Sequence, residues 1–321
     1  MTATETATRQ QRVRRRRRVR PAPGGVRPVQ VQRAPRRRVA TVVLPASAVV
    51  LQWILLVLAG IALWLFVFAL GLSQLQQQHN QHTLYATYRE QLAKATAPVG
   101  RVMREGAAVA MLDAPAAGLH GSVVVEGSTS ADLRSGPGHQ PGTPLPGQAG
   151  VAVIMGRSAS YGGPFARITA LRPGDVIVVT TGQGIFRYLV EDVREPGDPF
   201  PKALSVGGSQ LTLVTSQAQG WRSGWAPTHA VFVDAVLDGK TVAGGPGTVI
   251  ASAADKPMHG ETAGLPVLVL WLQVLALTVF GIVWGVVRWG RWQTWLVGVP
   301  ILAAALWGAA NSVWLLLPNL I

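Results

Sequence analysis

The sequence of 321 residues contains no cysteine and few charged side chains. The absence of cysteine excludes disulfides, thiolate metal sites and a cysteine nucleophile, and it leaves the redox compartment undetermined. Charged residues make up only 14% of the chain, whereas soluble proteins average about 25%. Much of the chain is therefore poorly suited to an aqueous environment.

The net charge of +14 is concentrated at one end of the chain. Residues 1–38 contain 13 arginines and one glutamate, and the rest of the chain carries 16 basic and 14 acidic side chains. A nucleic-acid-binding globule would carry its positive face within the folded part, so we expect no nucleic-acid partner. The Pro, Gly and Gln content predicts a disordered cytoplasmic tail at 1–38, whose arginines are suited to anionic lipid.

Three long apolar runs predict transmembrane helices at 49–72, 265–287 and 295–317. Each run exceeds the roughly 20 residues that a helix needs to cross the hydrocarbon core. Nine of the eleven tryptophans lie in or beside these runs, and several are near the ends, where indole rings favour the membrane interface. We expect all three segments to span the bilayer.

Arginines flank the runs on one side only. Arg14–Arg18 and Arg36–Arg38 precede the first run, and Arg288 and Arg291 separate the second from the third. Because cytoplasmic loops carry an excess of Lys and Arg, this pattern predicts a multi-pass plasma-membrane protein with a cytoplasmic N-terminus. Residues 73–264 are then extracytoplasmic, and the C-terminus lies outside.

The segment after the first run has a helical pattern. Leu84, Tyr88 and Leu92 recur every four residues, and Pro98 ends the pattern, which predicts a helical stalk at 73–98.

A β-rich domain follows at 105–240. Short β runs separated by Gly and Pro favour a small closed barrel or sandwich, a mainly β fold. After it, the Gly and Ala content of 241–264 predicts a flexible linker that returns to the membrane. The predicted strands are Ala108–Leu112, Ser122–Val125, Val151–Met155, Val176–Thr181, Phe186–Val190, Leu211–Thr215 and Ala230–Leu237.

Short motifs, most of them with Gly or Pro, recur through 105–240. They are Leu112-Asp-Ala-Pro-Ala-Ala-Gly-Leu119, Val125-Glu-Gly127, Leu133-Arg-Ser-Gly-Pro-Gly138 with His139, Leu145-Pro-Gly147, Gly162-Gly-Pro-Phe165, Leu171-Arg-Pro-Gly-Asp175, Tyr188-Leu-Val190 and Leu211-Thr-Leu-Val-Thr215. These motifs resemble the sortase family, and they occur in the family's order. The resemblance implies an eight-stranded sortase β-barrel, most like the actinobacterial class E type with an N-terminal anchor.

The resemblance also implies where the chemistry would lie. Sortases cleave a sorting peptide with a cysteine thiolate, a histidine as acid and base, and an arginine near the developing oxyanion. Ser216 stands at the cysteine position and Arg157 at the histidine position. Residues 226–229 stand where the family arginine opens the last strand, and nearby Arg222 is the candidate oxyanion or ligand-binding residue.

Serine catalysis would need a base beside Ser216, because a serine hydroxyl is a weak nucleophile alone. Arg157 cannot act as that base, since guanidinium stays protonated. His139 and His229 are the groove candidates that could approach Ser216, although the family register places neither in the histidine position. His139 also has a purely structural interpretation, as part of a turn.

Trp221 and Trp225 flank Arg222 in the loop after the active-site strand. Because Trp and Arg dominate binding hot spots, these tryptophans are candidate groove residues for a partner. Two alternatives are that they fold back over the barrel end or enter the lipid headgroups. We predict no cofactor and no metal, since His79 and His82 lack a third ligand at metal spacing.

Three function classes remain. We favour a catalytically degenerate pseudo-sortase that binds an extracellular protein or peptide at the cell surface. The first alternative is an active serine-dependent transpeptidase or peptidase that uses Ser216. The second is a structural subunit of a membrane complex, supported by Gln52, Gln273 and Asn311, since polar side chains within lipid seek partners on other helices.

Overall fold

The computed structural model describes residues 46–100, 102–217, 228–244, 251–262 and 264–321. The arginine-rich tail at 1–38 lies outside these residues. The helices are α1 (Ala46–Val67), the π-helical turn η1 (Phe68–Leu72), α2 (Ser73–Ala93), α3 (Gly264–Arg288) and α4 (Arg291–Leu316), with short 3-10 helices η2 (Pro115–Ala117), η3 (Asp132–Arg134), η4 (Ile168–Ala170) and η6 (Ala253–Asp255).

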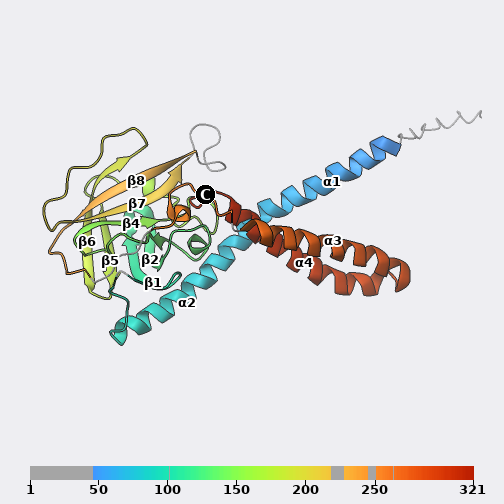
Figure 1. Ribbon diagram of the computed structural model, residues 1–321, viewed down its shortest axis with the longest axis horizontal. Helices are drawn as coiled ribbons and strands as arrows, with labels where there is room; N and C mark the ends of the chain where they lie inside the picture. Colours follow the sequence, from blue (N-terminus) through green and yellow to red (C-terminus); the bar gives the residue numbers. More distant parts are fainter. Residues whose placement is uncertain (1–45, 101, 218–227, 245–250, 263) are drawn as a thin grey trace, which may run out of the picture. The chain divides into compact units, whose positions relative to one another are not determined.

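Eight strands form a closed barrel (Figure 1) in the order β1-β2-β3-β4-β7-β8-β6-β5. The β2–β3 and β4–β7 pairs are parallel, and the other pairs are antiparallel. The strands are β1 (Ala108–Ala114), β2 (Leu119–Glu126), β3 (Gly138–His139), β4 (Gly150–Met155), β5 (Val176–Thr181), β6 (Gly184–Arg194), β7 (Ser209–Gln217) and β8 (His229–Leu237).

The mainly β, eight-stranded barrel confirms the predicted fold class. Each of the seven predicted runs lies within one observed strand. The run Val176–Thr181 coincides with β5, and the other six observed strands are longer at one or both ends. The eighth strand, β3, has only two residues, too few to show the period-2 alternation by which a strand is found in a sequence.

Strand β7 is the most enclosed part of the barrel. Eight of its nine residues are buried, because β7 lies between β4 and β8 and its polar side chains are also covered. Thr212 Oγ1 and Gln210 Nε2 donate hydrogen bonds to Asp234 on β8, at 2.7 and 3.1 Å, and Arg194 pairs with the same carboxylate. This makes β7 a rigid platform for the residues at its end.

Helix α2, within the predicted helical stalk at 73–98, packs on the barrel. The Tyr88 hydroxyl donates to the Val109 carbonyl oxygen at 2.9 Å. The Gln81 side chain bonds both polar groups of the Val123 backbone, accepting from its N–H at 2.8 Å and donating to its carbonyl at 3.0 Å. The apolar face predicted from the four-residue spacing exists, but it contacts β1 and β2 because those strands offer buried apolar partners.

Among the described residues, two helices are long and apolar enough to cross a membrane, Gly264–Gly285 and Trp292–Leu316. Two of the three predicted spans are thus found, and the predicted first span, 49–72, is not one of them. That segment is helical, and its last turn packs on other parts of the chain, since Phe68 is fully buried and meets the rings of Tyr161 and Trp307 edge-on. Two apolar helices beside a barrel of this kind suggest membrane anchoring.

Part of the return segment from the barrel to α3, predicted as a flexible linker at 241–264, is held by polar contacts where the structure describes it. The Asp255 carboxylate is buried and accepts hydrogen bonds from the backbone N–H and hydroxyl of Ser128, at 3.2 and 3.1 Å. Ser252 and Asp255 also form a capping box. These polar contacts hold a segment whose Gly and Ala content alone favours flexibility.

Candidate functional site

The parallel pairing of β4 with β7 brings the two predicted catalytic positions to one end of the barrel. Met155 pairs with Val214, and the chain after β4 continues alongside the end of β7. Arg157 and Ser158 therefore lie beside Ser216, whose hydroxyl oxygen is 2.9 Å from that of Ser158. We call Arg157, Ser158, Ser160 and Ser216 the serine–arginine corner.

The hydroxyl groups of the serine–arginine corner bind a backbone carbonyl of the same chain. The Ser216 hydroxyl donates to the Leu320 carbonyl oxygen at 2.6 Å. The same oxygen accepts hydrogen bonds from Ser158, from its backbone N–H at 2.9 Å and from its hydroxyl at 3.2 Å. Ser216 is 4% exposed, so this carbonyl closes the space in front of it.

The Arg157 guanidinium is fully buried. Its Nη1 donates to the Ile321 carbonyl oxygen at 2.9 Å, and its Nη2 donates to the carbonyl oxygen and hydroxyl of Ser130 at 2.7 and 2.9 Å. Its Nη1 also donates to the Ser160 hydroxyl at 3.1 Å. The guanidinium carbon lies 5.0 Å above the centre of the Tyr161 ring, within range of a cation–π interaction.

No carboxylate side chain of the described residues pairs with Arg157. Burial lowers the pKa of its guanidinium to about 10, so the side chain keeps its charge at neutral pH. Its Nε has no hydrogen-bond partner among the described residues. A buried cation in this setting favours a ligand that brings acceptor oxygens.

The side chain of Leu320 fills an apolar pocket beside these polar groups. It is fully buried, and its neighbours come from η3, β4, β7 and β8: Leu133, Met155, Val214 and Ala230. A hydrogen bond of 3.1 Å from the Ile321 N–H to the Pro318 carbonyl oxygen closes residues 318–321 into a turn. We call these residues the 318–321 segment.

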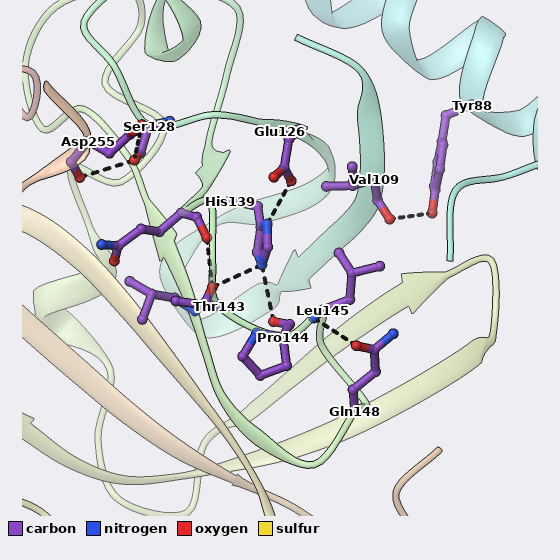
Figure 2. A network of polar contacts seen from close by, with 12 residues as sticks. Tyr88, Val109, Glu126, Ser128, His139, Thr143, Pro144, Leu145, Gln148 and Asp255 are labelled. Atoms are coloured by element: carbon purple, nitrogen blue, oxygen red, sulfur yellow. Dashed lines mark hydrogen bonds and ion pairs between the residues drawn. The ribbon is translucent and has the colours of Figure 1, made fainter. Parts of the chain in front are cut away.

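His139, a predicted groove candidate, belongs to a separate network in the barrel wall (Figure 2). Its Nδ1 is 2.7 Å from a carboxylate oxygen of Glu126, and its Nε2 is 3.1 Å from the Pro144 carbonyl oxygen and 3.0 Å from the Thr143 hydroxyl. The ring is 1% exposed. Both ring nitrogens are therefore engaged, which supports the structural interpretation of this histidine.

His229 begins β8 and pairs with Gln217, one position beyond Ser216. Its Nδ1 is 3.1 Å from the Thr228 hydroxyl, and its Nε2 is 3.9 Å from a carboxylate oxygen of Glu195. Among the described residues, the hydrogen-bond partners of the Ser216 side chain are Ser158 and Leu320. The other candidates, Trp221, Arg222 and Trp225, lie outside the described residues.

Sequence reasoning missed the polar partners that complete the corner. Ser130, Ser158 and Ser160 are ordinary loop serines in the sequence, and the 318–321 segment lies more than 100 residues from Ser216 along the chain. No local pattern marks such contacts, because they arise only when distant segments fold together. The adjacency of Ser158 to Arg157 was the one available signal.

Comparisons with known proteins bear on this site. Residues 112–231 match the family model described as the sortase domain. Sortase E from Streptomyces avermitilis is 30% identical, with 43% of this chain and 91% of that chain covered and a TM-score of 0.36. A Clostridium perfringens sortase D5 transpeptidase is 24% identical, and the match covers 50% of this chain and 99% of that chain with a TM-score of 0.41. No curated protein matches the chain.

Proposed function

The chain belongs to the sortase family, and from this premise we propose that it is a membrane-anchored pseudo-sortase. It binds a protein or peptide at the serine–arginine corner and does not cleave it. The binding takes place on the extracytoplasmic side, at the cell surface. Substitution of the catalytic cysteine and histidine positions by Ser216 and Arg157 is part of this proposal.

The observation that carries the proposal is the way the corner holds the Leu320 carbonyl. Two serine hydroxyls and one backbone N–H converge on that oxygen, while the adjacent pocket encloses an aliphatic side chain. Main-chain acceptors and apolar side chains are what a peptide offers to a binding site. The corner therefore retains the groups that peptide binding needs.

The same groups are poorly suited to cleavage. A serine nucleophile needs a neighbouring base, and general acid–base assistance typically contributes about 10²–10⁴-fold to a rate. Arg157 cannot accept a proton at neutral pH, because its pKa of about 10 keeps it charged. Within the described part of the chain, the histidine nearest in strand register, His229, contacts Thr228 and Glu195 instead.

The positions of the arginines along the chain support a proposal for its location and orientation in the membrane. The pair α3 and α4 crosses the membrane twice, and residues 73–264 face outward. The 1–38 tail stays in the cytoplasm, where it contacts anionic lipid, and this placement includes a further crossing by the apolar helix α1. Other membrane proteins can reach the chain through the apolar faces of α3 and α4. This orientation exposes the barrel to extracellular peptides.

Because the chain has no native cysteine, single introduced thiols can test the orientation. We expect a membrane-impermeant maleimide to label Ser205→Cys, an exposed barrel loop position, in intact cells. Ala3→Cys in the tail should react only after the cells are lysed. Labelling of Ala3→Cys in intact cells would overturn the orientation.

Binding without cleavage is tested with the full chain in detergent. The probe is a fluorescein-labelled pentapeptide, Leu-Pro-Asn-Leu-Ile, which repeats residues 317–321, at concentrations high enough to compete with the chain's own segment. We expect saturable binding by fluorescence anisotropy and an intact peptide by mass spectrometry. Cleavage that disappears in Ser216→Ala would instead establish the serine-dependent transpeptidase or peptidase.

A further inference from the structure

The serine–arginine corner is already occupied by the chain itself. Leu320 is fully buried, and Ser216 and Ser158 both bond its carbonyl oxygen. Arg157 and Ser160 both bond the carbonyl oxygen of Ile321. Each polar side chain of the corner thus contacts the 318–321 segment directly.

Asn319 fixes the segment from the other side. Its backbone N–H donates to the His259 carbonyl oxygen at 2.9 Å. Its side-chain amide donates to the carbonyl oxygens of Ser128 and Lys256, at 2.8 and 3.1 Å. Asp255 binds the same Ser128, so the return segment and the 318–321 segment are held as one unit against the barrel.

The chemistry of the occupied corner defines what could replace the segment. Loss of the Ile321 carbonyl would remove an acceptor from a guanidinium that is fully buried, and a buried cation without acceptors is costly. Loss of Leu320 would also expose the apolar pocket formed with Leu133, Met155 and Val214. A competing ligand must therefore supply both an aliphatic side chain and adjacent acceptor oxygens.

We infer that the 318–321 segment is a ligand in cis that keeps the corner closed, and that an external peptide binds only when this segment leaves. The competing ligand is a peptide with an aliphatic residue followed by a residue whose carbonyl or carboxylate reaches Arg157. Its competition with the segment rests on the proposed function, whereas the cis occupancy rests on the contacts alone.

Tethering makes this competition strong. The segment follows α4 without a linker, since the helix ends at Leu316, and a short tether gives an effective concentration of roughly millimolar. The apparent affinity for an external peptide falls in proportion to the fraction of molecules with an open corner. A change that expels the segment should thus strengthen external binding without adding any contact.

A single thiol at the corner tests the occupancy without any ligand. In Ser216→Cys the introduced thiol is the only one in the chain, and its reaction rate with a maleimide reports whether the corner is covered. The second substitution is Leu320→Asp, which places a carboxylate in the apolar pocket and should expel the segment. The matched control thiol is Ser205→Cys, which is exposed and far from the 318–321 segment in sequence.

We expect Leu320→Asp to raise the labelling rate of Ser216→Cys at least tenfold and to leave that of Ser205→Cys unchanged. Leu320→Ala, which shortens the side chain without adding charge, should raise the rate by a smaller factor. A circular dichroism spectrum and a cooperative thermal transition identify variants that keep the barrel. Equal labelling of Ser216→Cys in the native and Leu320→Asp backgrounds, with the barrel folded, would overturn the cis occupancy.

Peptide binding separates this inference from the proposed function. The fluorescein-labelled Leu-Pro-Asn-Leu-Ile peptide should bind the Leu320→Asp chain at least tenfold more tightly than the native chain. Equal affinities for the two chains would overturn the competition and leave the proposed binding function standing. If Leu320→Asp uncovers the thiol but neither chain binds the peptide, the cis occupancy stands and the proposed peptide-binding function fails.

Discussion

Two buried polar clusters of the barrel differ in where their partners come from. His139 is held by Glu126, which lies 13 residues away, and by Thr143 and Pro144, which lie four and five residues away. Ser216 and Arg157 bind oxygens that are 104 and 164 residues away. The first cluster is part of the barrel wall, whereas the second is completed by a segment outside the barrel.

The His139 cluster therefore belongs to the scaffold of the barrel, whereas the serine–arginine corner has the character of a binding site. The strands that carry the His139 cluster cannot separate without unfolding the barrel, since β2, β3 and β4 pair with one another. The 318–321 segment can leave the serine–arginine corner while every strand pair remains. Disrupting the first cluster should therefore lower the stability of the whole domain, and disrupting the second should mainly open the corner.

The largest expected effect is on the His139 cluster. Replacement of His139 by alanine leaves the Glu126 carboxylate buried at 3% exposure without its ring partner, which should lower the free energy of unfolding by about 3–5 kcal/mol. The measurement is denaturant unfolding followed by near-ultraviolet circular dichroism. Glu90→Ala removes an exposed pair with Lys94 and should change the free energy of unfolding by about 0–1 kcal/mol.

A His139→Ala protein as stable as the native chain would show that the network in Figure 2 does not support the barrel. The His139 cluster would then not differ from the serine–arginine corner in its effect on the stability of the barrel.

Arg157→Ala should have the next largest effect, and it should act on the corner. The variant loses the charge-assisted hydrogen bonds to Ile321 and Ser130, which should weaken the hold on the 318–321 segment by about 1.5–3 kcal/mol. Labelling of Ser216→Cys should accelerate by roughly 10- to 150-fold. The same change should weaken binding of an external peptide in a Leu320→Asp background.

Arg157→Lys is the matched control, because lysine keeps the charge but not the planar fork of donors. Its labelling rate should lie between those of the native and alanine variants. Loss of the thermal transition in both variants would assign Arg157 to the scaffold instead.

Ser216→Ala should have a smaller effect. The Leu320 carbonyl keeps its bonds from Ser158, so the loss of one hydrogen bond should cost about 0.5–1.5 kcal/mol. We expect cellular function to remain nearly intact in a complementation assay, while Arg157→Ala impairs it. A folded Ser216→Ala protein without function would favour serine catalysis over binding.

The smallest expected effect is that of pH between 5.5 and 8.5. Burial lowers the pKa of Arg157 only to about 10, so its charge is constant over this interval. Binding of the pentapeptide to the Leu320→Asp chain should change by less than about twofold, because a transition near pH 6.5 requires a histidine. A transition near pH 6.5 would point to His229.

Much of the barrel could be predicted from the sequence. Runs such as Val176–Thr181 and Leu211–Thr215 are β-branched and apolar, and Gly and Pro bound them, so local preference and tertiary position agree. The β3 strand was missed because two residues show no period. The four-residue spacing in α2 predicts an apolar face but not the surface that covers it.

The candidate site was predicted only in part. The resemblance to sortases brought Ser216 and Arg157 to attention, and the pairing of β4 with β7 places them side by side. His139 and His229 were also predicted as groove residues that could approach Ser216, but His139 binds Glu126 in the barrel wall. Alternating residues of a strand face opposite sides, so proximity in the sequence does not decide which side chain reaches a groove.

The sequence by itself determined the apolar helices, the strands and the residue types at the catalytic positions, because these depend on hydropathy, short periods and local motifs. Only the tertiary structure decided that the 318–321 segment covers Ser216 and that Arg157 is buried without a carboxylate side chain among the described residues. The physical reason is distance along the chain. Hydrogen bonds across more than 100 residues depend on how separate segments pack, and no local sequence pattern encodes them.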